Sequence, residues 1–218
     1  MLTSKESEDR SGARRAEGLL YVEVDCPPEL EAEFHAWYNL EHVPERLKIP
    51  GFLGGHRYAT LEGGPRWLAA YWLESPAVLE SPEYRQWMGP LMTPWTKRMI
   101  STTRVRRSVF RSIRSHTMGD VGRGTGLLAI RYTSAPPESR RLHGWHDDVF
   151  WPELSRIPDV VRADRYEDVE TSEHLVLYHL ANPWVIQDGQ FARTWTAGWE
   201  RQREALESWK RNLYVRIL

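Results

Sequence analysis

The chain has 218 residues, with 29 Lys and Arg against 30 Asp and Glu, so its formal net charge is −1. A near-neutral chain has no overall attraction to nucleic acid or to an anionic membrane, and no apolar run reaches the length of a transmembrane helix. Cys26 is the only cysteine, which excludes an internal disulfide and a cysteine-rich zinc site. The residues before Gly18 contain no apolar run typical of a secretory signal, so we expect a cytoplasmic protein.

The chain repeats itself at a spacing of 108 residues, which falls to 107 further along. The segment Gly18–Leu20 recurs as Gly126–Leu128. Other pairs that follow the repeat are His35 and His143, Trp37 and Trp145, Pro44 and Pro152, Arg57 and Arg165, and Tyr71 and Tyr178. We interpret this as a duplicated module. The predicted organisation is a disordered tail at 1–17, a first module at 18–111, a linker at 112–125 and a second module at 126–218.

Each module predicts the same order of elements. In the first they are a strand at 19–24, a helix at 29–43, two strands at 52–61 and 67–73, a helix at 82–100 that is interrupted near Gly89, and a strand at 104–113. Pro44 lacks an N–H, so the first helix should kink or restart there. The order β-α-β-β-α-β is that of ferredoxin-like folds. The predicted fold class is α+β, with two tandem ferredoxin-like modules that form one intrachain pseudo-dimeric α+β barrel.

Residues 37–46 (WYNLEHVPER), with IPGF at 49–52 and RY at 57–58, resemble the EthD-like family of the dimeric α+β barrel superfamily. The second half departs from this pattern, because Phe150 stands where the repeat places His42. The resemblance implies a pocket between helices and sheet and small, often aromatic or polyketide-like ligands. The superfamily includes cofactor-free monooxygenases, isomerases, decarboxylases and dehydratases, as well as haem enzymes, so the fold does not fix the function.

His42 is the candidate catalytic residue. It is predicted where the first helix reaches Pro44, and the carbonyl groups at a helix end favour a positively charged imidazolium. Histidine titrates near neutrality and can give or take a proton. Tyr38 lies one helical turn earlier on the same face, where its hydroxyl could orient the imidazole or hold a substrate oxygen. The alternative is that His42 only caps exposed carbonyl groups.

The predicted substrate-binding residues lie in the strands and among the tryptophans. Arg57 and Tyr58 are neighbours in a strand, so they point to opposite faces, and an inward Arg57 could hold a carboxylate or an enolate. The alternative is a surface salt bridge together with a core tyrosine. His56 shares the face of Tyr58. The remaining candidates, whose alternative role is core packing, are Trp37, Trp72 and Trp87.

A metal site and a cofactor site are both expected to be absent. His143 and His146 have a spacing that one metal ion can use, with Asp147 next to them. Such short strings are common, and a solvated polar helix face is the preferred interpretation. The sequence has no dinucleotide fingerprint, no P-loop and no nucleophile elbow, so no cofactor is predicted.

The first functional hypothesis is a cofactor-independent enzyme of the lyase, isomerase or decarboxylase type, in which His42 transfers a proton on a small apolar, aromatic or polyketide-like substrate. One working site per chain is expected, because Phe150 replaces His42 in the second module. The alternatives are a non-catalytic module that binds a hydrophobic small molecule, and monooxygenase-type oxygen chemistry. We expect no nucleic-acid or membrane partner, and the sequence leaves open whether two chains form a homodimer.

Overall fold

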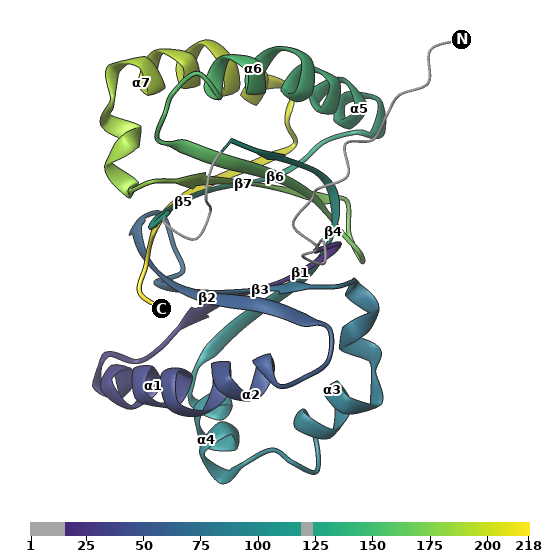
Figure 1. Ribbon diagram of the computed structural model, residues 1–218, viewed down its shortest axis with the longest axis vertical. Helices are drawn as coiled ribbons and strands as arrows, with labels where there is room; N and C mark the ends of the chain where they lie inside the picture. Colours follow the sequence, from purple (N-terminus) through teal and green to yellow (C-terminus); the bar gives the residue numbers. More distant parts are fainter. Residues whose placement is uncertain (1–15, 119–123) are drawn as a thin grey trace.

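The computed structural model describes residues 16–118 and 124–218. Most of the predicted tail, and part of the predicted linker, therefore lie outside the described residues. Two lobes are stacked on each other, and in each lobe helices cover the outer face of an antiparallel sheet (Figure 1). The inner faces of the two sheets are turned toward each other (Figure 1).

The two lobes have the same β-α-β-β-α-β order, as the sequence predicts. The first lobe contains β1 (Gly18–Asp25), α1 (Glu31–Trp37), α2 (Val43–Leu47), β2 (Phe52–Glu62), β3 (Trp67–Leu73), α3 (Pro82–Trp87), α4 (Pro94–Thr102) and β4 (Arg104–Thr117). The second contains β5 (Gly126–Thr133), α5 (Pro136–Trp145), α6 (Trp151–Leu154), β6 (Val160–Asp168), β7 (Glu173–Leu180), α7 (Gly189–Trp195) and β8 (Ser208–Arg216). The predicted α+β fold class is confirmed.

The eight strands form one closed antiparallel barrel in the order β1-β3-β2-β8-β5-β7-β6-β4. The lobes join along two seams, where β2 pairs with β8 and β4 pairs with β6. Each edge strand of one lobe is thus paired with an edge strand of the other. Closure of this kind removes the unpaired backbone groups that an open sheet would expose.

The alternation of residues along the strands separates three apolar cores. In β1, Leu19 and Tyr21 point into the barrel, whereas Leu20 packs under the helices of the first lobe. The barrel interior is filled by side chains from both lobes, including Phe110, Tyr166 and Tyr214. The other two cores lie between each sheet and its own helices. The pockets to be considered therefore lie under the helices or at the barrel ends.

The strand β4 is longer than the sequence indicates. The strand was predicted to end at residue 113, within the linker expected at 112–125, but it continues to Thr117. Its last residues pair with β6, for example Arg114 with Arg165 and His116 with Ala163. This segment has the polar composition of a loop, and only its partner strand in the second lobe makes it extended. The long strand is what closes one seam of the barrel.

The first helix does not end at His42. The helix α1 passes through one π-helical turn, Tyr38–His42, and continues directly into α2, which ends at Leu47. Pro44 lies in the first turn of α2, where a missing N–H is tolerated. The second lobe repeats this device with a π turn at His146–Phe150 ahead of α6. The expectation that His42 sits at a helix end, next to free carbonyl groups, is therefore wrong.

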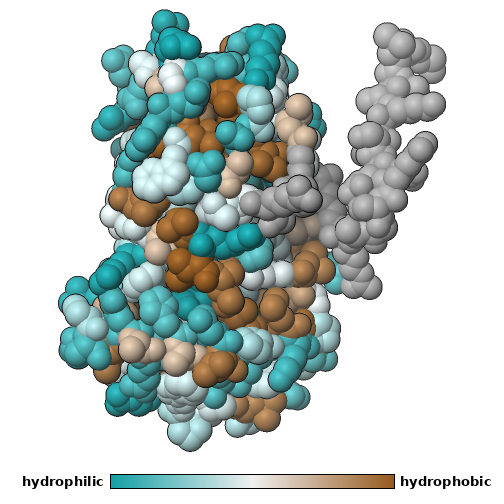
Figure 2. Space-filling view, turned by 60° about the vertical axis from the view of Figure 1, so that its left-hand side comes forward, coloured by the Kyte–Doolittle hydropathy of each residue, from teal (hydrophilic) through white to brown (hydrophobic). Residues whose placement is uncertain are grey.

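On the face that Figure 2 shows, the surface is mostly hydrophilic toward the two ends of the molecule, and many apolar side chains lie near its middle. Within residues 16–118 and 124–218, no helix is both long enough and apolar enough to span a bilayer.

Candidate functional site

The first lobe contains a cavity of about 150 Å³ between its sheet and its helices. Its walls are mainly apolar and include Leu20, Phe34, Trp37, Tyr84, Met88 and Ile100. The polar side chains that also line it are Tyr38, His42, Arg46, Tyr71, Thr103 and Arg107. A cavity of this volume is large enough for about one benzene-sized ring. An apolar pocket with a few placed polar groups is the usual form of a small-molecule site.

His42 presents a neutral imidazole to this cavity. Its ring packs against Trp37, with ring centroids 4.4 Å apart, and against Tyr38 at 5.1 Å. The Nδ1 atom of His42 is buried and has no hydrogen-bond partner. Burial, and next the nearby positive charge of Arg46, hold the pKa of His42 well below its usual value. The ring is therefore uncharged at neutral pH and can accept a proton.

The π turn that carries His42 is fixed to α4 by a short chain of hydrogen bonds. The Glu41 carboxylate accepts hydrogen bonds from the hydroxyl groups of Thr93, at 2.5 Å, and Thr96, at 2.9 Å. The Thr96 hydroxyl also accepts one from the Trp37 indole Nε1 at 3.0 Å. Glu41 thus faces away from the cavity and holds the helix that positions His42.

Arg46 lies one helical turn after His42, and only 2% of it is exposed. Its Nη2 atom is 3.1 Å from the Met88 sulfur, and its guanidinium lies 5.7 Å from the centre of the Tyr84 ring. Its Nη1 atom is buried without a partner. No carboxylate in the described part of the chain forms an ion pair with Arg46. The sequence analysis did not propose this residue as part of the site.

Tyr71, on β3, was likewise not proposed, and its buried hydroxyl also has no hydrogen-bond partner. The cavity is therefore lined by three residues that each have an unsatisfied polar atom, His42 Nδ1, Arg46 Nη1 and the Tyr71 hydroxyl. Buried polar groups are nearly always paired in native proteins, so three such atoms around one apolar cavity point to a ligand. The repeat of Tyr71 at Tyr178 was visible in the sequence, but a missing partner is visible only in three dimensions.

Arg57 lies behind Tyr38, on the same side of the sheet as the cavity. The Tyr38 ring lines the cavity, and burial raises the pKa of its hydroxyl to about 12. The Arg57 guanidinium is 4.3 Å from the centre of that ring. It donates to Asn39 Oδ1 at 2.7 Å and to His35 Nδ1 at 3.0 Å. Arg57 therefore lies beside Tyr38 and does not itself line the cavity.

The other predicted binding residues are divided by the sheet. Trp37 lines the cavity, and Trp87 packs against the same core without lining it. Tyr58 faces the barrel interior, on the opposite side of the sheet from His42, and Trp72 packs against that interior core. His56 lies beside Trp72, with ring centroids 5.5 Å apart. The structure brings His42, Tyr38 and Trp37 together and does not bring His56, Tyr58 and Trp72 to them.

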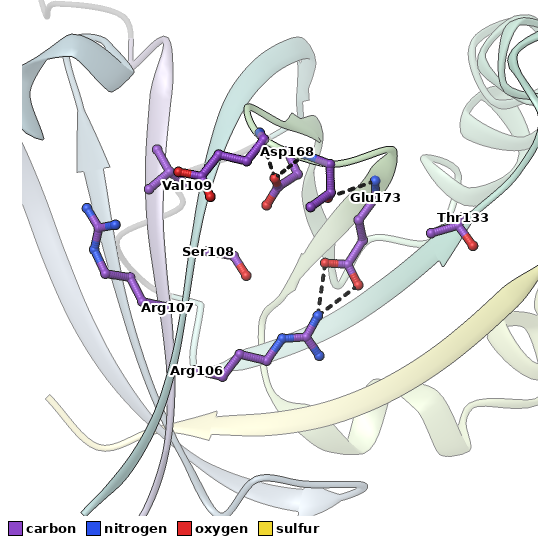
Figure 3. Close-up of a pocket in the computed structure, with 9 residues that line it drawn as sticks. Arg106, Arg107, Ser108, Val109, Thr133, Asp168 and Glu173 are labelled. Atoms are coloured by element: carbon purple, nitrogen blue, oxygen red, sulfur yellow. Dashed lines mark hydrogen bonds and ion pairs between the residues drawn. The ribbon is translucent and has the colours of Figure 1, made fainter.

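A larger pocket of about 360 Å³ lies at one end of the barrel, lined by charged residues of both signs (Figure 3). Arg106 forms an ion pair with Glu173 there at 3.2 Å (Figure 3). Arg131 binds both Glu173 and the fully buried Glu23. Arg106, Arg131, Glu23 and Glu173 are thus joined in one network of ion pairs, in which Arg131 Nε alone is buried without a partner.

The second lobe contains a cluster of His116, His146 and Asp147, whose candidate ligand atoms lie within 4.8 Å of one another. Both carboxylate oxygens of Asp147 are already bound by the Arg165 guanidinium, at 2.7 and 2.8 Å. Asp147 also binds His116 at 2.8 Å. A guanidinium in this position repels a metal cation, so we assign the cluster to a hydrogen-bond network. His143, the other histidine considered from the sequence, packs against His174 instead.

Solved structures with this fold show what the chain is similar to. An anthrone oxidase-like protein has a TM-score of 0.65 at 10% sequence identity, with 94% of this chain and 93% of that one covered. A mutant chlorite dismutase from Candidatus Nitrospira defluvii also scores 0.65, at 8% identity, with 96% of both chains covered. A monooxygenase-like protein from Listeria innocua scores 0.53 at 7% identity, covering 94% and 96%.

No protein-family model matches the sequence, and no curated protein matches it either. At these identities the solved structures establish the fold alone, which is that of the dimeric α+β barrel superfamily. Haem, which some proteins of this superfamily carry, does not fit the first-lobe cavity, because a space for one ring cannot hold a macrocycle of four pyrroles. This chain therefore has the dimeric α+β barrel fold, with both halves of the barrel in one polypeptide.

Proposed function

We propose that the first-lobe cavity binds a small, largely apolar, aromatic or polyketide-like molecule and that His42 removes a proton from it. The observation that carries this proposal is the buried, unpartnered Nδ1 of a neutral imidazole in an apolar cavity. The reaction class is that of a lyase, isomerase or decarboxylase, and the proton transfer itself uses only side chains of the protein.

The surrounding groups support each part of that step. The proton passes from the substrate to His42 Nδ1, and its electron pair remains on the substrate as an enolate or phenolate. The free N–H of Arg46 and the Tyr71 hydroxyl can donate hydrogen bonds to the oxygen on which negative charge develops. Return of the proton to another carbon completes an isomerisation, and its transfer to a departing group completes an elimination. In a decarboxylation the proton taken is that of the carboxylic acid, and it returns to the carbon that has lost CO₂.

The proposal is tested by proton exchange in D₂O. Phenylacetone and phenylpyruvate each carry one ring and exchangeable CH₂ protons, whose loss can be followed by NMR. We expect the protein to accelerate exchange of at least one of them, and His42→Gln to lower the rate at least about 100-fold, the usual contribution of a general base. Unchanged exchange in the variant excludes His42 as the base. Binding of both probes without any exchange favours the alternative, a non-catalytic binding module.

Monooxygenase-type chemistry is the second candidate, because similar structures include an anthrone oxidase-like and a monooxygenase-like protein. The same proton removal from a CH₂ group would give a carbanion that adds O₂. Protonation of the product gives a hydroperoxide, and loss of water from the hydroperoxide gives a ketone, so one O₂ is consumed for each ketone and water formed. Oxygen uptake that depends on His42 supports this course, and exchange under argon with no oxygen uptake in air excludes it.

We also propose that the chain is an EthD-like protein that arose by tandem duplication. The pattern at residues 37–46 supplies both His42 and Arg46 to the cavity. The equivalences in the sequence hold in the pairing of strands, since Leu20 lies opposite Tyr71 as Leu128 lies opposite Tyr178.

A further inference from the structure

We infer that the first-lobe cavity selects an anion, and that its ligand is a single-ring aromatic carboxylate whose carboxylate group is bound by Arg46. This inference rests on the proposed function for the location of the ligand, but it does not depend on proton transfer by His42. It names the substrate class and assigns a binding role to a residue that sequence patterns did not identify.

The burial of Arg46 is the first argument. A guanidinium that is 2% exposed and has no acidic partner among the described residues is energetically unfavourable, because a buried charge needs a counter-charge and satisfied hydrogen bonds. Its Nη2 atom donates a hydrogen bond to the thioether of Met88, which is a weak acceptor. A carboxylate in the cavity could accept two parallel N–H bonds from the guanidinium, the geometry that this pair prefers.

The charge around the cavity is the second argument. Its lining includes the cations Arg46 and Arg107 and no aspartate or glutamate. Arg57, behind Tyr38, is also buried, and it is held by the neutral groups Asn39 and His35. Burial, and next the positive charge of Arg57, lowers the pKa of His35, so His35 adds no compensating charge. The charged side chains that line the cavity are therefore all cationic, although Arg107 is exposed and the Glu45 carboxylate lies near Arg46 outside the lining.

The second lobe supplies an internal control for both arguments. The position equivalent to Arg46 is Leu154, which is fully buried in an apolar core. The position equivalent to Asn39 is Asp147, which neutralises Arg165. The same fold is thus stable with an aliphatic residue at the first position and with a paired arginine at the second. The uncompensated charge is therefore a property of the first lobe and not a requirement of the fold.

The size of the cavity limits the ligand. A volume of about 150 Å³ takes one six-membered ring, so benzoate-like molecules fit. A fused polycyclic molecule would have to extend beyond the walls formed by Met88 and Ile100.

The test compares benzoate with benzamide, which has nearly the same size and shape but no charge. Calorimetry at pH 7 should show that the wild-type protein binds benzoate at least about 10-fold more tightly than benzamide. Arg46→Leu, which copies the second lobe, should remove this preference, and Arg46→Lys should retain part of it. Equal affinities in the wild type, absence of benzoate binding, or an unchanged preference in Arg46→Leu would each overturn the inference.

The Tm of each variant without ligand is measured as a control, to show that a change in binding is not caused by loss of folding. Replacing an unpaired buried charge by an apolar residue should raise the Tm of Arg46→Leu and Arg46→Met by about 2–4 °C. A fall in Tm for both variants would show that Arg46 has a stabilising partner and would contradict the premise. His42→Gln should keep the preference for benzoate, so that loss of proton exchange with retained anion binding separates this inference from the proposed function.

Discussion

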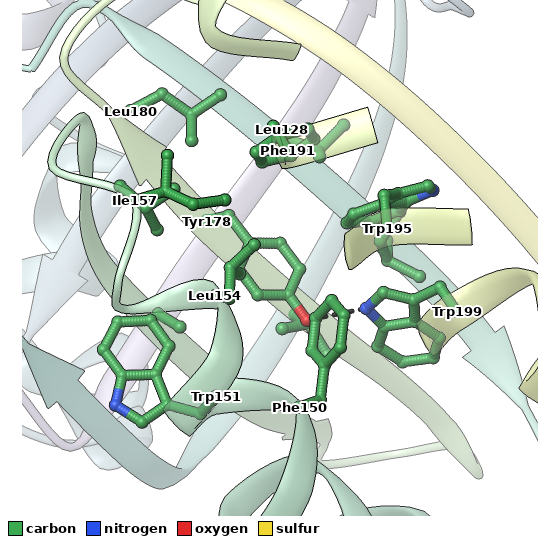
Figure 4. Packing of buried hydrophobic residues seen from close by; sticks show 14 of the residues in the cluster. Leu128, Phe150, Trp151, Leu154, Ile157, Tyr178, Leu180, Phe191, Trp195 and Trp199 are labelled. Atoms are coloured by element: carbon green, nitrogen blue, oxygen red, sulfur yellow. Dashed lines mark hydrogen bonds between the residues drawn. The ribbon is translucent and has the colours of Figure 1, made fainter. Parts of the chain in front are cut away.

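The two lobes differ in the side chains beneath their first helices at three of four equivalent positions. The equivalent pairs are Tyr38 and His146, His42 and Phe150, Arg46 and Leu154, and Tyr71 and Tyr178. In the second lobe, Phe150 packs among tryptophans (Figure 4), and it also lines a pocket of about 310 Å³ together with Trp145 and Gly198. The Tyr178 hydroxyl accepts a hydrogen bond from Trp199 Nε1 at 2.7 Å and bonds His146 Nε2 at 2.9 Å, whereas the Tyr71 hydroxyl has no partner.

This comparison shows how few residues separate a packed core from a pocket. The strands, the π turn and the following proline are the same in both lobes. What differs is the set of side chains beneath the first helix: Tyr178 has two hydrogen-bond partners, whereas Tyr71, His42 and Arg46 each have an unpartnered buried polar atom. The second lobe also keeps unpartnered buried atoms, such as His146 Nδ1. The two lobes share one backbone arrangement, and the side chains at a few equivalent positions determine how the space beneath the first helix is used.

The largest expected effect is on the rate of proton exchange, when His42 is replaced by phenylalanine, the residue at the equivalent position of the second lobe. His42→Phe should reduce proton exchange at least about 100-fold, because it removes the general base and fills part of the cavity. Phe150→Leu changes the equivalent position of the second lobe and should leave the exchange rate unchanged. NMR of phenylpyruvate in D₂O measures both, and equal losses in the two variants would show that the lobes do not differ in function.

The next effect concerns Arg57 and Arg165, the buried arginines at equivalent positions of the two lobes. Asp147→Asn should lower the free energy of unfolding by about 3 kcal/mol, because it leaves Arg165 buried without its carboxylate. Asn39→Asp should give Arg57 such a partner and raise stability by at most about 1 kcal/mol, since residue 39 is exposed. Urea unfolding measures both. Equal and small effects would mean that the two arginines are held in the same way.

The pH dependence of stability should include a contribution from the second lobe, beside that of His42, whose pKa is also lowered by burial. Burial, the largest cause, lowers the pKa of His143 and His146 to about 4, well below the value of about 6.5 in an unfolded chain. The unfolded chain then binds more protons, so stability is complete above pH 6.5 and is lost as the pH falls toward 4. Each histidine contributes about 1.4 kcal/mol for each unit of depression. Urea unfolding from pH 7 to 4 should show a shallower decline for His146→Gln.

The smallest expected effect is on the free energy of unfolding, when Tyr71 or its equivalent Tyr178 is replaced by phenylalanine. Tyr178→Phe removes the partner of Trp199 and His146 and should cost about 1–2 kcal/mol. Tyr71→Phe removes a hydroxyl that has no partner and should change the free energy of unfolding by less than about 0.5 kcal/mol. A large loss for Tyr71→Phe would show that its hydroxyl is satisfied after all.

The sequence predicted the strands well, because alternation and turn residues are local signals. Strand β3 has the predicted bounds, and β1 and β5 each extend by one residue at both ends. The sequence did not predict that β4 continues to Thr117, because the last residues of this strand are extended only through their pairing with β6 of the other lobe. It also placed His42 at a helix end, because a proline usually stops a helix and no local signal marks a π turn.

The site was predicted only in part. Tyr38, His42 and Trp37 were found from the motif and do line one cavity. Which of Arg57 and Tyr58 faces the helices could not be decided, because alternation alone does not tell one face from the other. Arg46 and Tyr71 were missed because their significance lies in partners that are missing, and spacing along the chain carries no information about that.

The two seams of the barrel have a consequence for how such a protein can change. When a barrel is assembled from two identical subunits, symmetry copies every mutation into both halves. Here a mutation alters a single half, because the partner across each seam is another stretch of the same polypeptide. An unfavourable residue such as a solitary buried guanidinium is then carried once per barrel, while the opposite half remains free to act as the stabilising scaffold.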